Sequence, residues 1–270
     1  GYLGDGMLDS VAIGEVFASP PALAFYDAIV DADQGEGVAV LFGNYAGDNM
    51  NVKMAVQMAE DDDIEVKYVV ANDDVASAPK AVKEQRHGIA GGFFMWKVGG
   101  ARAAKGGSLD DVIASAQNVV NRTKSICVGL EPCVIPALGH SNFKIEDGTM
   151  EFGVGHHGEA GTKVEKLKSA SEMAQEMAET ILNDFDFEEG KEVAVMLSSL
   201  GATPVMELYV LYDEVEKVLA KAGHKVWKTY IGNYVTSLDM NGASLTIVDL
   251  DDEIKELLSE PAVPIGMKNY

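Results

Sequence analysis

The sequence predicts an α/β fold built from two domains, and three observations support this prediction. Short apolar runs typical of buried strands alternate with longer runs of helical pattern. Aromatic residues make up only 7% of the chain, whereas glycine, alanine and valine are plentiful, which suits close packing of helices on a sheet. The length of 270 residues allows one large domain or two of ordinary size.

The first half of the chain is expected to contain strand–helix–strand units. Strands are predicted over 36–43 and 64–71, with a helix over 49–62 between them. Two more helices are predicted, one within 88–106 and one from Ser108, where the stretch SLDD is typical of a helix N-cap. Strands separated by helices of this length indicate a mostly parallel sheet.

The second half repeats this mixture in a different order. The expected strands cover 125–132, 150–155, 191–201 and 243–250, and the expected helices cover 169–185, 204–223 and 251–260. We therefore expect a first α/β domain over 1–122 and a second over 123–270, each with a mostly parallel or mixed sheet covered by helices.

Charge and composition exclude several classes of function. The formal net charge of −22 repels phosphate backbones and anionic lipid surfaces, so we expect neither nucleic acid nor a membrane as partner. No stretch has the length and apolarity of a membrane span, and we expect a cytoplasmic protein. The cysteines, Cys127 and Cys133, lie in or beside an apolar run and are interpreted as buried free thiols.

The stretch GVGHHGEAG over 153–161 is the first candidate site. Its glycines spell G-x-G-x-x-G, but the following residues are not the apolar start of a helix that would bind a pyrophosphate. A metal site is also disfavoured, because the adjacent side chains of His156 and His157 point to opposite faces of an extended segment. A third interpretation is that the glycines clear space for one neutral imidazole to attack a ketone and form a hemiaminal. A purely structural glycine loop remains the alternative.

The stretch NYAGDNMN over 44–51 is the second candidate site. It follows a predicted strand, Gly47 permits a tight turn, and Asp48 is expected at the N-cap of the next helix. Ligands of open α/β sheets collect at the carboxyl ends of strands, so Asp48 is a candidate base for a substrate hydroxyl. A plain capping role is the alternative. The acidic pair in NDDVA, over 72–76, is interpreted as a turn.

Taken together, these segments resemble the substrate-binding subunit of dihydroxyacetone kinases. The resemblance covers nearly the whole chain, in the order GYLGDGMLDSVAIGEVFASP, NYAGDNMN, NDDVA, GIAG, PCVIPALGHSNF, MEFGVGHHGEAG, LGATPVMELY and TSLDMNGASLTI. It implies two α/β domains and a homodimer. It also implies that His157 binds the ketone carbon of dihydroxyacetone as a hemiaminal and that Asp48 deprotonates the hydroxyl that accepts phosphate. Gly155 and Gly47 would then border the substrate.

The sequence departs from the family pattern at several places. A Gly-Ser-Gly-His-Glu-Pro loop that normally precedes this region has no counterpart after Gly1, so we expect an N-terminally truncated substrate-binding subunit. Gly43 stands where many kinase members carry lysine, and His156 occupies a place that is usually apolar in the family.

The resemblance also implies that the nucleotide lies elsewhere. We expect no cofactor on this chain, and ADP or ATP with magnesium on a separate helical subunit that a phosphotransferase-system protein recharges in bacteria. Two alternatives stay open. The chain could serve a related ketose such as erythrulose, or be a non-catalytic ketose-binding co-activator that works with a transcription factor.

Overall fold

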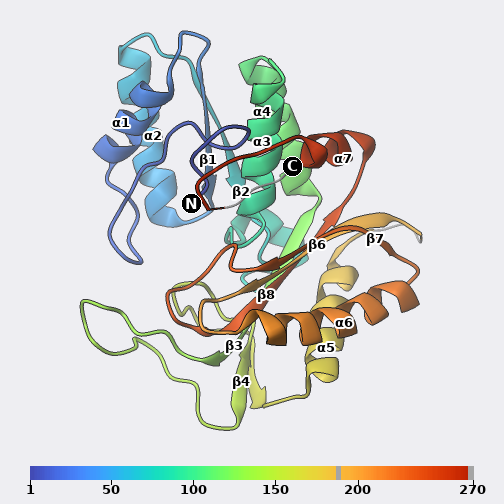
Figure 1. Ribbon diagram of the computed structural model, residues 1–270. Helices are drawn as coiled ribbons and strands as arrows, with labels where there is room; N and C mark the ends of the chain where they lie inside the picture. Colours follow the sequence, from blue (N-terminus) through green and yellow to red (C-terminus); the bar gives the residue numbers. More distant parts are fainter. Residues whose placement is uncertain (187–189, 267–270) are drawn as a thin grey trace. The chain divides into compact units, whose positions relative to one another are not determined.

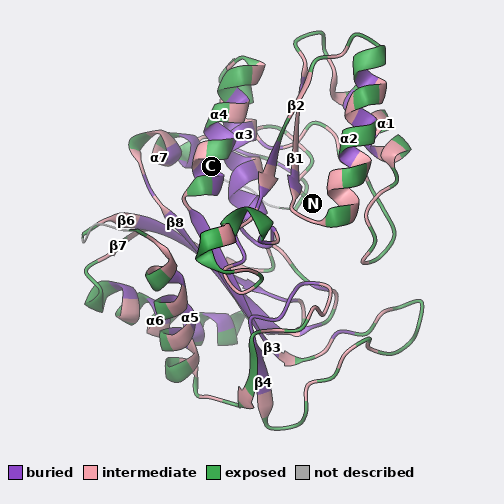
Figure 2. Cartoon of the chain, turned by 180° about the vertical axis from the view of Figure 1, so that it is seen from behind, coloured by how far each residue is buried: buried purple, intermediate pink, exposed green. Residues whose placement is uncertain are grey.

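The computed structural model describes residues 1–186 and 190–266, and its chain forms two compact units, each with its own sheet (Figure 1). Unit 1 comprises Gly1–Ala71, Gly92–Asn121 and Asp251–Tyr270. Unit 2 comprises Asn72–Gly91 and Arg122–Leu250. The strands over 123–131, 192–199 and 241–249 are mostly buried, and the outer faces of the helices are exposed, as Figure 2 shows by colour. No helix in the two described ranges combines the length and apolarity needed to cross a membrane.

Unit 1 is built on two parallel strands. Its elements are α1 (Ala22–Ala32), β1 (Val38–Gly43), α2 (Ala46–Asp61), β2 (Val66–Ala71), α3 (Gly92–Ala104), α4 (Leu109–Asn121) and α7 (Asp252–Ser259). Val38 and Phe42 of β1 belong to a core cluster with residues of α1 and α2, whereas Leu41 lies against Gly99 of α3. Because alternate residues of a strand face opposite ways, the α1–α2 pair and α3 cover opposite faces of this sheet.

Unit 2 contains a mixed six-stranded sheet. Its strands are β3 (Thr123–Glu131), β4 (Thr149–Phe152), β5 (Lys163–Lys166), β6 (Glu192–Ser199), β7 (Lys225–Gly232) and β8 (Asn241–Asp249), in the spatial order β5-β4-β3-β8-β6-β7. Only β6 and β7 pair in parallel among these described strands, so this sheet is mainly antiparallel.

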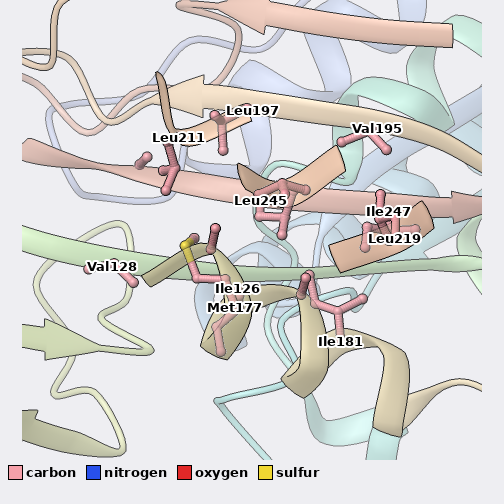
Figure 3. Packing of buried hydrophobic residues seen from close by; sticks show 14 of the residues in the cluster. Ile126, Val128, Met177, Ile181, Val195, Leu197, Leu211, Leu219, Leu245 and Ile247 are labelled. Carbon is pink, nitrogen blue, oxygen red and sulfur yellow. The ribbon is translucent and has the colours of Figure 1, made fainter. Parts of the chain in front are cut away.

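Helices α5 (Ala170–Asp184) and α6 (Val205–Lys221) cover one face of this sheet. Figure 3 shows the core that results, with side chains from three strands meeting side chains from both helices: Ile126, Val128, Val195, Leu197, Leu245, Ile247, Met177, Ile181, Leu211 and Leu219. Each fully buried side chain of this size contributes about 1.5–3 kcal/mol. The strand residues between them, Cys127, Met196 and Thr246, point to the opposite face, which is also buried and where Ser125 Oγ lies 2.7 Å from Thr246 Oγ1.

The two units differ from the expected split at residue 122. One change of unit, at Asn121/Arg122, lies one residue before that split, but residues 72–91 belong to unit 2 and residues from Asp251 belong to unit 1. Backbone hydrogen bonds explain the first difference: Ser125 donates to Asp73 O at 2.8 Å and Val75 donates to Ser125 O at 3.0 Å, so the segment is joined to β3. Packing explains the second, because α7 contacts α3 and α4.

Most expected elements are present. The cap pattern at Ser108 is confirmed, since Asp111 N donates to the Ser108 hydroxyl at 3.3 Å and that hydroxyl donates to Asp111 Oδ2 at 2.8 Å at the start of α4. Four elements were not anticipated, namely α1, the 3₁₀ helix η1 (Lys80–Gln85), the short edge strand β5 and the edge strand β7. The expectation that Asp48 caps a helix is wrong. Asn49 N already donates to Tyr45 O at 2.9 Å, so α2 begins at Ala46 and Asp48 lies inside its first turn.

Candidate functional site

The histidine loop follows β4 in unit 2. Gly153 N donates to Cys127 O at 2.7 Å, which joins the start of the loop to β3. Gly158 N donates to Gly155 O at 3.1 Å, so His156 and His157 are the two central residues of a tight turn. Gly153 and Gly158 have φ values of 78° and 79°, which a residue with a side chain rarely adopts.

One carboxylate holds both the backbone and the ring of His157. Glu159 Oε2 accepts from His157 N at 2.8 Å, and Glu159 Oε1 lies 2.9 Å from His157 Nδ1. Burial raises the pKa of Glu159, but the hydrogen bond with His157 and further local bonds outweigh it and lower the pKa from 4.5 to about 2. An ionised carboxylate can only accept, so Nδ1 carries the proton and the lone pair of the neutral ring lies on Nε2.

Gly155 makes this arrangement possible. A Cβ at residue 155 would lie 2.2 Å from Glu159 Oε2 and 2.8 Å from Glu159 Cβ, so any side chain there would displace the carboxylate. The glycine is therefore required for the position of Glu159, whatever space it also leaves for a ligand.

His156 is a buried, neutral neighbour. It is 8% exposed, its carbonyl oxygen accepts from Ser237 Oγ, and its Nε2 has no hydrogen-bond partner among the described residues. Desolvation, followed by the nearby His157, lowers the pKa of His156 from 6.5 to about 4. Of the two histidines, His157 is the accessible one, with 37% of its side chain exposed.

Asp48 and Gly47 lie in the first turn of α2 in unit 1. Ser19 Oγ donates to Asp48 Oδ2 at 2.7 Å. A Cβ at residue 47 would lie 2.5 Å from that hydroxyl, so Gly47 lets Ser19 approach the turn. Asp48 itself is half-buried. The candidate residues thus form two groups: Gly155 and His157 share a turn of unit 2, and Gly47 and Asp48 share a helical turn of unit 1.

The acidic pair after β2 is buried. The carboxylate of Asp73 accepts from Ile89 N at 3.0 Å and from Gly91 N at 2.7 Å, and Asp74 Oδ1 accepts from Ala76 N at 3.0 Å. Desolvation is the main reason that the pKa of Asp74 rises from 3.8 to about 7. Both side chains therefore organise the 72–91 segment, as expected for turn residues.

Cys127 and Cys133 are buried free thiols, as the sequence predicts. Burial raises the pKa of Cys127 well above 9.0, which makes it unreactive. In residues 1–186 and 190–266, no group of three or more His, Cys, Asp or Glu side chains could hold a metal ion.

Sequence reasoning missed the two partners of the candidate residues. Glu159 is two residues from His157, and only the turn brings its carboxylate back to the ring. Ser19 is 29 residues from Asp48 and carries no local signal of the contact.

Comparison with known proteins gives consistent matches. Residues 1–265 match the Dak1 domain family. A protein of Listeria innocua, the PTS-dependent dihydroxyacetone kinase 1, dihydroxyacetone-binding subunit DhaK, is 41% identical over 253 residues, or 94% of this chain and 77% of that protein. The D-erythrulose kinase of Mycolicibacterium smegmatis is 36% identical over 97% of this chain and 45% of that protein.

Solved structures agree with the sequence matches. The dihydroxyacetone kinase operon co-activator Dha-DhaQ has a TM-score of 0.91 and 29% identity, over 97% of this chain and 81% of that chain. The dihydroxyacetone kinase of C. freundii has a TM-score of 0.89 and 29% identity, over 97% of this chain and 47% of that chain, so a kinase and a co-activator share this fold with the chain. Together, the match to residues 1–265 and the 41% identity show that the chain belongs to the Dak1 domain family.

Proposed function

We propose that this chain is the dihydroxyacetone-binding subunit of a dihydroxyacetone kinase and that His157 holds the ketone covalently. The contact between His157 Nδ1 and Glu159 carries the proposal, because it leaves the lone pair of the ring on Nε2. Relatives named as dihydroxyacetone-binding subunits support the substrate class.

The covalent step is an addition. The lone pair of His157 Nε2 forms a bond to the carbonyl carbon, and the π electrons of the carbonyl move to its oxygen, which takes a proton from solvent. The ring becomes an imidazolium that keeps its proton on Nδ1, and the Glu159 carboxylate at 2.9 Å balances its charge. No atom leaves, so the product is a hemiaminal. Glycerol has no carbonyl and cannot be held in this way.

Asp48 would act as the base in the second step. It accepts the proton of the terminal hydroxyl as that oxygen attacks phosphorus, which keeps the nucleophile from carrying a positive charge. Asp48 lies in the first turn of α2, where the backbone N–H groups of the helix carry a partial positive charge. Because the hemiaminal only holds the substrate, most of the catalysis would come from positioning.

The phosphoryl donor would come from another polypeptide. ADP or ATP with magnesium is carried by a helical nucleotide-binding subunit, and the present chain works as a homodimer without its own cofactor. The description of several relatives as one subunit of a kinase supports such a partner.

Two specific observations favour other versions of this role. Relatives named D-erythrulose kinase and L-erythrulose 1-kinase favour a four-carbon ketose, which offers the same carbonyl beside a hydroxymethyl group. The TM-score of 0.91 to a co-activator, with Gly43 at a position where many kinases carry lysine, favours a ketose sensor without catalysis.

The test combines two assays on the full-length protein. Native intact mass spectrometry with dihydroxyacetone, erythrulose or glycerol should show an increase equal to one whole ketose, without loss of water, for the wild type and none for His157→Ala. Phosphate transfer is then measured with a nucleotide-carrying kinase subunit loaded with ATP and magnesium. Adduct with transfer supports the kinase subunit, adduct without transfer supports the co-activator, and absence of any adduct rejects both.

A further inference from the structure

We infer that Ser19 is a positioning residue for Asp48: its hydroxyl holds one carboxylate oxygen and so directs the other toward the substrate hydroxyl. This inference rests on the proposed function, because Asp48 needs to be aimed only if the chain takes part in phosphoryl transfer.

The hydrogen bond itself is short and joins distant parts of the chain. Ser19 Oγ donates to Asp48 Oδ2 at 2.7 Å across 29 residues, and both side chains are half-buried. An O–H···O⁻ bond of this length is charge-assisted and stronger than a neutral one. Ser19 engages only Oδ2, which leaves Oδ1 without a hydrogen-bond partner among the residues that the structure describes.

The backbone around Ser19 is held in an unusual conformation. Phe17 has a φ of 57°, in the left-handed region that an aromatic residue seldom adopts. Asn51 Nδ2 donates to Pro20 O at 2.8 Å, which fastens the segment to α2 a second time. Strained backbone of this kind persists where its surroundings enforce it, and it is common at functional sites.

The two glycines next to this segment allow the close approach. A Cβ at residue 14 would lie 2.8 Å from both Ala18 O and Pro20 N, and a Cβ at residue 47 would lie 2.5 Å from Ser19 Oγ. The backbone is thus shaped on both sides to bring the serine hydroxyl to Asp48. A bond that served only to cap α2 would not need this close approach of Ser19 to Asp48, because the N-cap residue of the helix is Tyr45.

The consequence is a carboxylate with one oxygen fixed and one available. Rotation about the last bond of the Asp48 side chain would break the bond from Ser19, so Oδ1 keeps one direction. A base that is misplaced by about 1 Å can lose on the order of 100-fold in rate, although it is still present. Ser19 therefore acts on the rate of transfer and not on the capture of the ketose.

The experiment compares Ser19→Ala, Ser19→Thr, Asp48→Asn and a matched control, Ser108→Ala, in the full-length protein. The control removes the same kind of bond, Ser108 Oγ to Asp111 Oδ2 at 2.8 Å, at the start of α4 in the same unit. Dihydroxyacetone is the acceptor and an ATP-loaded nucleotide subunit of a dihydroxyacetone kinase is the donor. The readouts are kcat, KM for the ketose, and the His157 adduct measured by intact mass.

We expect Ser19→Ala to lower kcat about 10- to 100-fold while KM and the adduct stay within about twofold of the wild type. Ser19→Thr keeps the hydroxyl and should restore most of kcat, and Ser108→Ala should match the wild type. In a double-mutant cycle, Ser19→Ala should add little to the loss caused by Asp48→Asn.

Other outcomes overturn the inference in separable ways. If Asp48→Asn abolishes transfer but Ser19→Ala behaves like Ser108→Ala, the proposed function stands and the role of Ser19 is rejected. If Ser19→Ala lowers the adduct and kcat together and threonine does not rescue them, its role is merely structural. If the wild-type chain forms the adduct but never transfers phosphate, the kinase function fails, and the inference fails with it.

Discussion

At the scale of single residues, the reactivity of His157 depends on a side chain two positions away. Glu159 fixes the turn through His157 N and the ring through Nδ1, and its low pKa keeps it ionised at neutral pH. The His156 side chain, by contrast, is buried and stays neutral, whereas 37% of the His157 side chain is accessible. Position in the turn therefore decides which of two adjacent histidines can react.

Replacing Glu159 by glutamine tests this dependence. Gln keeps the size of the side chain but removes the charge that balances the imidazolium. We expect Glu159→Gln to weaken ketose binding on the order of 10-fold, the value of one charge-assisted hydrogen bond. The fraction of adduct against ketose concentration, measured by intact mass, gives the affinity. The control is Glu179→Gln, which makes the same substitution at an exposed position of α5. Equal ketose affinities in the two variants would contradict the role assigned to Glu159.

The Glu159 carboxylate also predicts a pH dependence. Its pKa is about 2 in the folded chain and 4.5 ordinarily, so its contribution to stability is full above pH 4.5 and is lost as the pH falls toward 2. Because this group is partly solvated, the effect on unfolding is modest.

The ionisation of Asp74 changes stability with pH in the opposite direction. Its pKa is about 7 in the folded chain and 3.8 ordinarily, so the folded state binds the extra proton between these values. Stability therefore decreases as the pH rises through this range, by at most about 4 kcal/mol. Desolvation is the main cause, and the charges of Asp73 and Glu159 add to it while Arg86 opposes it.

Asp74→Asn should abolish that decrease, because asparagine can still accept from Ala76 N but does not ionise. Urea unfolding at about pH 5 and about pH 8 gives the two free energies. We expect the variant to gain stability relative to the wild type at the higher pH. An identical pH difference in both proteins would show that Asp74 ionises normally.

Much of the site could be predicted from residue patterns, but not the side chains that hold the candidate residues in place. His157 and Asp48 stand in recognisable motifs and are among the residues singled out from the sequence. Glu159 and Ser19 act only through the turn and the loop that bring them near, and neither contact has a spacing typical of a regular element. The same limit applies to Asp48, whose motif indicates a helix start but not whether it caps the helix or lies within its first turn.

At the scale of elements, one buried arginine attaches the 72–91 segment to α5. Arg86 is 1% exposed, and its guanidinium donates two parallel bonds to Asp184, at 2.7 and 2.8 Å. Burial raises the pKa of Asp184, but Arg86 outweighs it and the net pKa is lowered. This pair fixes a segment that also lies against the histidine loop, since a Cβ at Gly153 would meet Ala76 Cβ at 2.6 Å.

Removing Arg86 should therefore be costly. Arg86→Ala leaves a half-desolvated carboxylate without its partner, and we expect a loss of about 3 kcal/mol in the free energy of unfolding. Lys80→Ala is a matched control, because it breaks an exposed ion pair from the same segment to Asp186 at 2.7 Å and should cost under about 1 kcal/mol. Chemical denaturation checks both values, and similar losses in the two variants would refute the distinction.

The substitution Gly155→Ala tests whether the histidine loop can accommodate a side chain at this position. The added methyl group occupies the place of the Glu159 carboxylate, so we expect ketose binding to fall at least as far as in Glu159→Gln, about 10-fold or more. Adduct titration checks the affinity, and circular dichroism checks that the fold is kept. Unchanged affinity would mean that the loop can move to accommodate the methyl group.

The elements predicted best were those with long, regular patterns. The strands β1, β3, β6 and β8 and the helices α5 and α6 lie within a few residues of their expected positions. The edge strands β5 and β7 were missed because edge positions are half-exposed and show no continuous apolar run, as the sequences KVEK and KVWKTYIG illustrate. These segments are strands because they pair with β4 and β6, and a local sequence pattern carries no information about that pairing.

At the scale of the whole molecule, the chain is interleaved between its two units. The sequence indicated two α/β parts with a single boundary after residue 122, one residue beyond the change at Asn121/Arg122. It could not indicate that residues 72–91 leave unit 1 or that residues from Asp251 return to it, because both depend on long-range contacts. Membership of the Dak1 domain family then links this fold to ketose kinases and to a co-activator.

The central claim is that His157 Nε2 adds to the carbonyl carbon of a short ketose. The most direct test is NMR of the protein with dihydroxyacetone carrying ¹³C at the carbonyl carbon and with ¹⁵N-labelled histidine. We expect the ketone resonance to be replaced by that of a tetrahedral carbon with a one-bond coupling to a single histidine nitrogen, lost in His157→Ala. A bound ketose that keeps its ketone resonance, or a coupling that survives in His157→Ala, would contradict the account.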